Sequence, residues 1–106
     1  MINFEEFEKI DLRLAKIIFA ERIEGSEKLL KIQAEVGEEK RQIIAGIGKF
    51  YAPEDLVNKT IVVVANLEPR MMMGLESQAM LLAIKNEENL SVVIPEKEMP
   101  SGLKLS

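Results

Sequence analysis

The sequence contains no cysteine and no histidine among its 106 residues. The lack of cysteine excludes disulfides, zinc–thiolate sites and thiol nucleophiles, and the lack of histidine excludes every imidazole general base. The many carboxylates form no spaced pair inside an apolar segment, so we predict no catalytic site, no metal and no cofactor. A chain without cysteine is compatible with a reducing compartment, and we expect a cytoplasmic protein.

Long apolar runs are also missing, because no stretch has the length and apolar character needed to span a bilayer. The N-terminus is acidic and lacks the pattern of a signal peptide, so no membrane association is expected. Nearly half of the residues, 47%, are hydrophobic, which suffices for a core. The length predicts a single domain over residues 1–106.

Positive charge is in short supply, with a formal net charge of −4. This balance argues against a non-specific polyanion binder. The charge is unevenly distributed: residues 1–8 hold three acids and no base, whereas residues 9–70 hold eleven bases and ten acids. The middle of the chain can therefore carry a local basic face, although for most of these charges a solvated surface of mixed sign is the simpler interpretation.

The clearest structural pattern is an alternation of apolar and polar residues in the first half. It predicts a strand over Asp11–Ile23 and a second over Leu29–Val36, joined by a polar turn. In the first strand the alternation slips by one near Lys16 and Ile17. Such a slip predicts a β-bulge, which small barrels need for their curvature.

The remaining elements are short. A helix is predicted around Phe4 and Phe7, which lie at helical spacing among acids. Further along, we predict a strand over Arg41–Ala45, one helical turn over Pro53–Leu56, and strands over Thr60–Ala65, Ala79–Ile84 and Leu90–Ile94. This order predicts a mainly β protein. A helix between strands three and four fits the five-stranded Greek-key barrel known as the OB-fold, which leaves one face free for oligonucleotides or sugars.

The connection between two of these strands, Asn66–Gln78, is the most informative stretch. Pro69 cannot donate to a strand ladder, and Gly74 permits a sharp turn, so we expect a long loop that closes a hairpin. Loops held by buried strands often carry binding sites. The alternative is an irregular turn with no ligand.

The side chains of this region and its surroundings suit RNA. Arg13, Lys28, Arg41 and Arg70 are expected to reach phosphates, Asn66, Ser77 and Gln78 to read base edges or sugar hydroxyls, and Met73 and Met80 to pack on bases. A core position in strand five is the alternative for Met80, and gap filling under the loop is the alternative for Met71–Met73. Stacking platforms are expected to be scarce, because three of the four phenylalanines read as buried.

These residues carry a resemblance to a known family. Asp11–Leu14, Glu27–Leu29, Asn66–Arg70 and Gly74 with Glu76–Met80 resemble motifs of the tRNA-binding domain family. That family includes the C-terminal domain or beta subunit of methionyl-tRNA synthetase, free-standing tRNA-binding proteins, a cytokine-precursor domain and a bacterial secretion chaperone. The resemblance extends from about residue 4 to the end. It implies an OB-fold that dimerises through its terminal elements and holds the outer corner of tRNA.

The resemblance also implies site residues. Ser77 and Met80 match residues that the family uses on tRNA, and Arg13, Asn66 and Arg70 fall on its shared surface. Two departures weaken the positive field: the family usually has lysine at Met71 and often at Glu68, and it often has His-Pro within Glu24–Ser26. Each missing phosphate contact could lower affinity about tenfold. We therefore expect a tRNA-binding homodimer, with methionyl-tRNA synthetase as a further partner. The alternative is a secretion-type chaperone, which a salt-dependent tRNA shift would distinguish.

Overall fold

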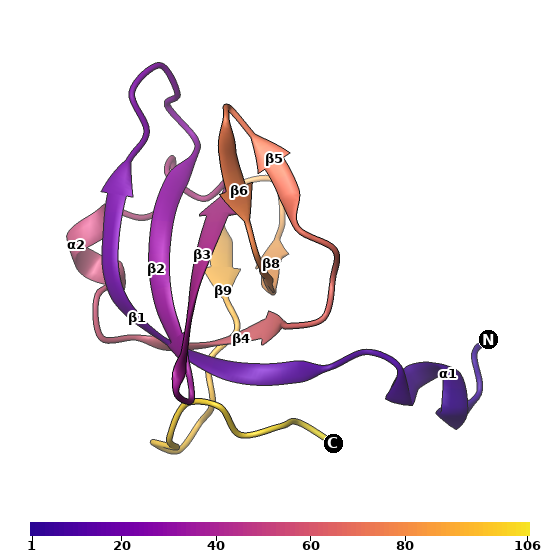
Figure 1. Cartoon of the computed structure of the whole chain (residues 1–106). Coiled ribbons are helices and arrows are strands. Elements are labelled where there is room, and N and C mark those ends of the chain that lie inside the picture. The colour runs from indigo at the N-terminus through magenta and orange to yellow at the C-terminus, as the bar shows by residue number, and fades with distance from the viewer.

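The computed structural model describes the whole chain, and its main element is a five-stranded antiparallel sheet in the order β3-β2-β1-β4-β7 (Figure 1). Its strands are β1 (Leu12–Arg22), β2 (Leu30–Val36), β3 (Glu39–Ala45), β4 (Thr60–Val64) and β7 (Met80–Leu81). Two small hairpins pair β5 (Arg70–Met72) with β6 (Leu75–Ser77), and β8 (Ala83–Lys85) with β9 (Leu90–Val92). The helices are α1 (Phe4–Glu8) and α2 (Pro53–Leu56). The mainly β class and the helical turn between the third and fourth strands are confirmed.

Strand β1 is bent by an irregularity that the sequence predicts. The pairing with β2 shifts register between Ile17 and Phe19, where the apolar alternation slips. The extra residue turns the strand, so its first half pairs with β4 and its second half with β2. After the shift, the inward position belongs to Ala20, opposite Ile32, and Phe19 turns outward.

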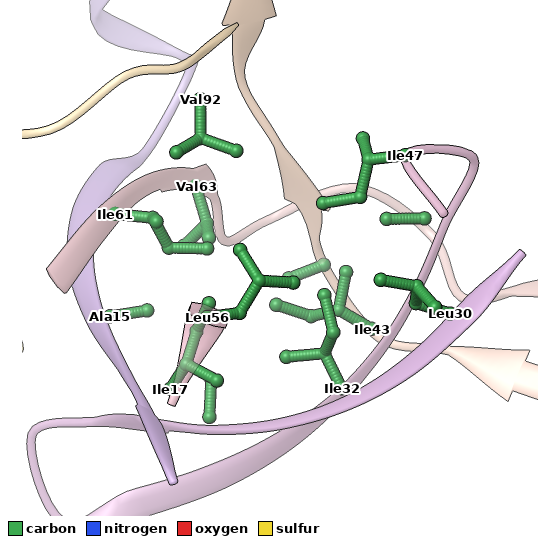
Figure 2. Close-up of a cluster of buried hydrophobic side chains, with 13 residues drawn as sticks. Ala15, Ile17, Leu30, Ile32, Ile43, Ile47, Leu56, Ile61, Val63 and Val92 are labelled. Atoms are coloured by element: carbon green, nitrogen blue, oxygen red, sulfur yellow. The ribbon is translucent and has the colours of Figure 1, made fainter. Parts of the chain in front are cut away.

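The core lies inside the curl of this sheet. Leu56 of α2 is fully buried and points in among Ile17, Ile32 and Val63 in Figure 2. The cluster has thirteen members: Ala15, Ile17, Leu30, Ile32, Ala34, Ile43, Ala45, Ile47, Leu56, Ile61, Val63, Ala79 and Val92. Because the strands and α2 all contribute, burial of one apolar cluster fixes both the curl and the position of the helix.

The segment before β7 lies along the free edge of β3. The Gln78 N–H donates to the Gln42 carbonyl at 2.7 Å, and the Ile44 N–H donates to Ser77 Oγ at 3.0 Å. These bonds bring the two ends of the curled sheet together. They also place the connection after β4 beside β3, although the two are far apart in sequence.

Two predictions in this region are wrong in detail. The stretch expected to be a plain loop contains the β5–β6 hairpin, whose two-residue turn has φ of 50° at Met73 and 77° at Gly74. Positive φ at both positions is the geometry of a type I′ turn, which matches the twist of short hairpins. The strand predicted over Ala79–Ile84 is interrupted at Leu82, which bonds instead to Val62 and Val93.

The N-terminal helix α1 forms as predicted and projects away from the sheet (Figure 1). Asn3 and Glu6 form a capping box at its start, and none of its residues is buried. At the other end of the chain, the tail crosses β1, where the Gly102 N–H donates to the Leu14 carbonyl at 2.7 Å. No helix of the structure has the length and apolar character needed to cross a membrane.

Candidate nucleic-acid interface

A pocket of about 240 Å³ opens between the end of β3 and the connection that follows β4. The β1–β2 loop and the β5–β6 hairpin rise at the same end of the sheet (Figure 1). The lining is mainly apolar, with one cation and one acid: Ile44, Ala45, Gly46, Ile47, Leu67, Glu68, Arg70, Met72, Ser77, Ala79, Met80 and Leu81. An apolar hollow with a few polar groups is typical of a ligand site.

The two rising loops touch each other. The Met73 methyl carbon at the tip of the hairpin lies 3.6 Å from where a Cβ would stand at Gly25 of the β1–β2 loop. The other end of that loop is held to the segment after β3, because the Gly48 N–H donates to the Lys28 carbonyl at 2.7 Å. Three separate parts of the chain are therefore neighbours at this end of the sheet: the β1–β2 loop, the segment after β3 and the β5–β6 hairpin. The surface that they form around the pocket is here called the rim.

Two of the predicted phosphate-binding cations lie at this rim with their charges unpaired. Arg70 lines the pocket and is exposed, and Lys28 is exposed beside Gly48. Neither takes part in any of the three ion pairs of the structure. Both can therefore accept an anionic ligand without first breaking an internal pair.

Three methionines on or beside the connection after β4 are exposed. Met73 is 55% exposed and Met80 is 48% exposed, and Met71 is exposed as well. The alternative that Met80 is a core residue is therefore wrong, as is gap filling for Met71 and Met73. Flexible, polarizable side chains of this kind can adapt to flat ligands such as bases.

Arg41 has a different environment from Arg70. Its side chain is partly buried, and Nη1 donates to the Ala65 carbonyl at 2.6 Å and to the Gln78 carbonyl at 3.2 Å. Nε and Nη2 donate to the Glu39 carboxylate at 3.1 and 2.8 Å. The guanidinium thus ties β3 to both ends of the connection that follows β4.

Ser77 and Gln78 are also engaged internally. Ser77 is 8% exposed, and its hydroxyl accepts from the Ile44 N–H and donates to the Ala79 carbonyl at 3.1 Å. The Gln78 amide accepts from the Gln42 N–H at 2.9 Å and donates to the Glu76 carboxylate at 3.1 Å. Both side chains hold the connection against β3, and their contacts with tRNA stay predictions.

Arg13 and Asn66 lie away from the pocket. Arg13 forms an ion pair with Asp11 at 2.7 Å and donates to the Gly102 carbonyl at 3.1 Å. Asn66 accepts from the Asp11 N–H at 2.9 Å and donates to the Lys9 carbonyl at 2.6 Å, so it anchors the segment that leads from α1. The structure therefore gathers Lys28, Arg70, Met73 and Met80 at the rim and uses the other predicted residues as internal ties.

Sequence reasoning missed two features of this surface. Leu67 lines the pocket from the connection, and only the position of that connection beside β3 reveals it. The expectation that three phenylalanines are buried is wrong, because all four are exposed, including Phe19 in the middle of β1. The slip near Ile17 was the signal for Phe19, since a shift of one residue turns an inward side chain outward.

With this geometry in view, comparison with known proteins gives a direct result. Residues 12–104 match the family model described as "Putative tRNA binding domain". The chain belongs to the tRNA-binding domain family. The match includes every residue of the pocket and every residue predicted to contact tRNA.

Relatives of this chain can be aligned with it over nearly its full length. It is 51% identical over 105 residues to a methionine–tRNA ligase of Caldanaerobacter subterraneus subsp. tengcongensis, which covers 99% of this chain and 16% of that enzyme. The chain spans only 14% to 17% of the length of the first three curated relatives that it matches.

Two crystal structures match the fold across its full length. A MetRS related protein from Pyrococcus horikoshii has a TM-score of 0.93 at 31% identity, covering 100% of this chain and 98% of that one. A chaperone CsaA from Bacillus anthracis str. Ames has a TM-score of 0.90 at 32% identity, covering 100% and 99%.

Proposed function

We propose that this chain is a non-catalytic tRNA-binding OB-fold domain that recognises the shape of its ligand through the pocket and its rim. The observation that carries the proposal is the contact of the β1–β2 loop with the hairpin of the connection after β4, at the end of the sheet where the pocket opens. Lys28 of that loop and Arg70 of the pocket lining take part in no ion pair. In five-stranded Greek-key barrels of the OB type, these same two loops flank the oligonucleotide-binding face. Membership of the tRNA-binding domain family supports RNA as the ligand.

The charge at the rim sets the strength of binding. Two unpaired cations release few counterions, so the logarithm of affinity should fall with the logarithm of salt with a slope of only about −2. Such weak binding suits a domain that works while attached to a larger tRNA-binding enzyme, where tethering raises the effective concentration. We therefore propose methionyl-tRNA synthetase as the partner, with this chain as its beta subunit or as a free tRNA-binding protein.

The test is a mobility shift with tRNA and with a DNA duplex of equal length, at low and moderate salt. We expect tRNA to bind more tightly, because the A-form minor groove and the ribose hydroxyls distinguish RNA. Equal affinity for the duplex, or no shift with any tRNA at tens of micromolar, would overturn the proposal. A pull-down from native extract, probed for methionyl-tRNA synthetase, tests the enzyme partner separately.

We also propose a homodimer. Helix α1 projects from the sheet with Phe4 and Ile2 exposed, and Ile94 and Leu103 add exposed apolar surface near the other terminus. Exposed apolar surface of this kind is unfavourable on a monomer, and two-fold self-association is the commonest way to cover it. Sedimentation at micromolar concentration should give a dimeric mass, and deletion of residues 1–9 should lower it. A monomeric mass, or a mass unchanged by the deletion, would contradict this.

A chaperone is the second candidate, favoured by the likeness to the CsaA structure and by the apolar lining of the pocket. A chaperone of this type should delay the aggregation of an unfolded model protein at equimolar ratio, and salt should have little effect because the contacts are apolar. Protection without any tRNA shift would favour this candidate. A salt-dependent tRNA shift without protection would favour the first.

A further inference from the structure

A row of three side chains crosses the outer face of the sheet, separate from the pocket. Phe19 of β1 is paired with Gln33 of β2, and Gln33 is paired with Gln42 of β3. Residues paired in register point to the same face, and the neighbouring pair Ala20 and Ile32 points inward. Phe19, Gln33 and Gln42, here called the amide strip, therefore lie side by side on the outer face, and Phe19 is 48% exposed.

The two amides of the strip are oriented by hydrogen bonds. Gln33 Nε2 donates to Gln42 Oε1 at 2.9 Å, and Gln42 Nε2 donates to the Glu76 carbonyl at 2.9 Å. This chain of bonds leaves Oε1 and one N–H of Nε2 of the Gln33 side chain unused. An acceptor and a donor are thus held on the residue that is paired with the exposed Phe19.

We propose that the amide strip binds one unpaired nucleobase of an RNA ligand. An exposed ring on a strand is a stacking platform for any base, whereas base edges carry adjacent donors and acceptors that an amide can match in pairs. The proposal rests on the proposed function, and it adds a base-binding site to the phosphate and shape contacts of the rim. It assigns the base contact to Phe19 and Gln33, with Gln42 as a positioning residue that fixes the Gln33 amide.

The strip is continuous with the pocket region. The Gln42 N–H donates to Gln78 Oε1 at 2.9 Å, and Gln78 belongs to the connection that carries Arg70. An RNA held at the rim can therefore extend an adjacent unpaired base toward the strip without leaving the protein surface. A base inside a duplex cannot reach the ring in this way, because its faces are already stacked.

The charges around the strip are of mixed sign, so a simple phosphate site does not explain it. Lys31 lies on the same face but is paired with Glu21 at 3.4 Å. The next row on the same face, Lys16, Glu35 and Lys40, brings a carboxylate between two lysines. Contacts at the strip should therefore depend weakly on salt, in contrast with the contacts of Arg70.

The absence of tryptophan from the chain permits a direct test. In Phe19→Trp, the only indole of the protein would lie on the strip, and a stacked base quenches indole fluorescence. The probes are a ten-nucleotide unstructured oligoribonucleotide, a tRNA, and an RNA duplex of matched charge. Phe50→Trp is the matched control, because Phe50 is also exposed, at 37%, but lies beyond β3 with Lys85 over its ring at 5.5 Å.

We expect the oligoribonucleotide and the tRNA to quench Phe19→Trp, the duplex to quench it little, and none of them to quench Phe50→Trp strongly. Phe19→Leu keeps an apolar side chain on the strand but removes the stacking face, and it should weaken oligoribonucleotide binding about tenfold. Gln33→Leu should weaken it less, and neither change should alter the salt slope of tRNA binding.

The outcomes separate this inference from the proposed function. If tRNA shifts the parent protein but no RNA quenches Phe19→Trp, the amide strip is not a base site while the proposed function stands. If the oligoribonucleotide quenches Phe19→Trp and no tRNA shift occurs, the strip stands and tRNA is the wrong ligand. Equal quenching of Phe19→Trp and Phe50→Trp would also overturn the inference, because it would indicate contact without a defined stacking site.

Discussion

Arg41 of β3 and Arg70 of the connection after β4 differ sharply in their surroundings. Arg41 is partly buried and makes four hydrogen bonds, whereas Arg70 is exposed and makes no ion pair. The same division runs through all nine residues predicted to contact tRNA. The tied residues are Arg13, Arg41, Asn66, Ser77 and Gln78, and the rim residues are Lys28, Arg70, Met73 and Met80.

This difference divides the nine residues into a group that stabilises the fold and a group that is open to a ligand. Among the tied residues, Arg41, Ser77 and Gln78 hold the connection against β3 and so fix where the rim lies. Arg13 and Asn66 instead hold the segments around Asp11 and Gly102. The rim residues present charge and apolar surface to a ligand at low cost, because no internal bond must be broken first. The predictions below separate the two sets by measuring stability and binding on the same variants.

Arg41→Ala should have the largest effect. It removes the guanidinium bonds to the Ala65 and Gln78 carbonyls, and a hydrogen bond to a charged group contributes about 1.5–3 kcal/mol. Since the side chain retains some contact with water, we expect the free energy of unfolding to fall by about 2 kcal/mol in urea denaturation.

Lys40→Ala is the control for Arg41→Ala, because Lys40 is the neighbouring exposed cation and forms no ion pair. It should change the free energy of unfolding by less than about 0.5 kcal/mol. Equal stability of both variants would show that Arg41 is not a tie.

Ser77→Ala should have the next largest effect on the free energy of unfolding. The change leaves the buried Ile44 N–H without an acceptor, which costs about 1–3 kcal/mol, and we expect a loss near the lower end because the site borders the pocket. Thermal or urea denaturation measures it, with Ser91→Ala on an exposed strand position as the comparison. Binding of tRNA, measured well below the unfolding transition, should change less than about threefold, since a loss of 1.4 kcal/mol is needed for tenfold.

If Ser77→Ala weakened tRNA binding more than about threefold and left stability unchanged, Ser77 would belong with the rim residues and not with the tied residues. That result would restore the expectation drawn from the family resemblance alone, in which the hydroxyl meets the ligand.

Lys28→Ala should have the smallest effect, confined to binding. Lys28 is exposed and unpaired, so stability should be unchanged, and one partly screened phosphate contact contributes roughly threefold in affinity. A salt titration of tRNA binding by fluorescence anisotropy measures this. Unchanged affinity at low salt would place the β1–β2 loop outside the interface.

Much of the fold could be predicted because it depends on periodicity. The alternation over Leu29–Val36, the slip near Ile17 and the single turn at Pro53–Leu56 each record a local rule that tertiary structure does not override. The β5–β6 hairpin could not be predicted from alternation, because its strands have three residues each. Its stability comes from the type I′ turn at Met73 and Gly74 and from contact with β3.

The sequence alone could locate the candidate site, but it could not separate the tied residues from the rim residues. Residue types identify Arg41 and Arg70 alike as phosphate ligands, and only the position of Ala65, Gln78 and Glu39 around the first guanidinium distinguishes them. Phe19 illustrates the converse case. Its outward orientation depends on the exact position of a bulge, which the pattern places only to within a residue or two.

The most direct test of this account is the salt dependence of tRNA binding by the parent protein, Arg70→Ala and the control Lys97→Ala. Arg70 lines the pocket, whereas Lys97 lies in the C-terminal segment after β9. We predict that Arg70→Ala weakens binding roughly five- to tenfold at low salt and lowers the slope of log affinity against log salt by about one unit, with unchanged thermal stability. Lys97→Ala should match the parent in both. An Arg70→Ala variant that binds with parental affinity and slope would contradict the account, because the rim would then not be the tRNA-binding surface.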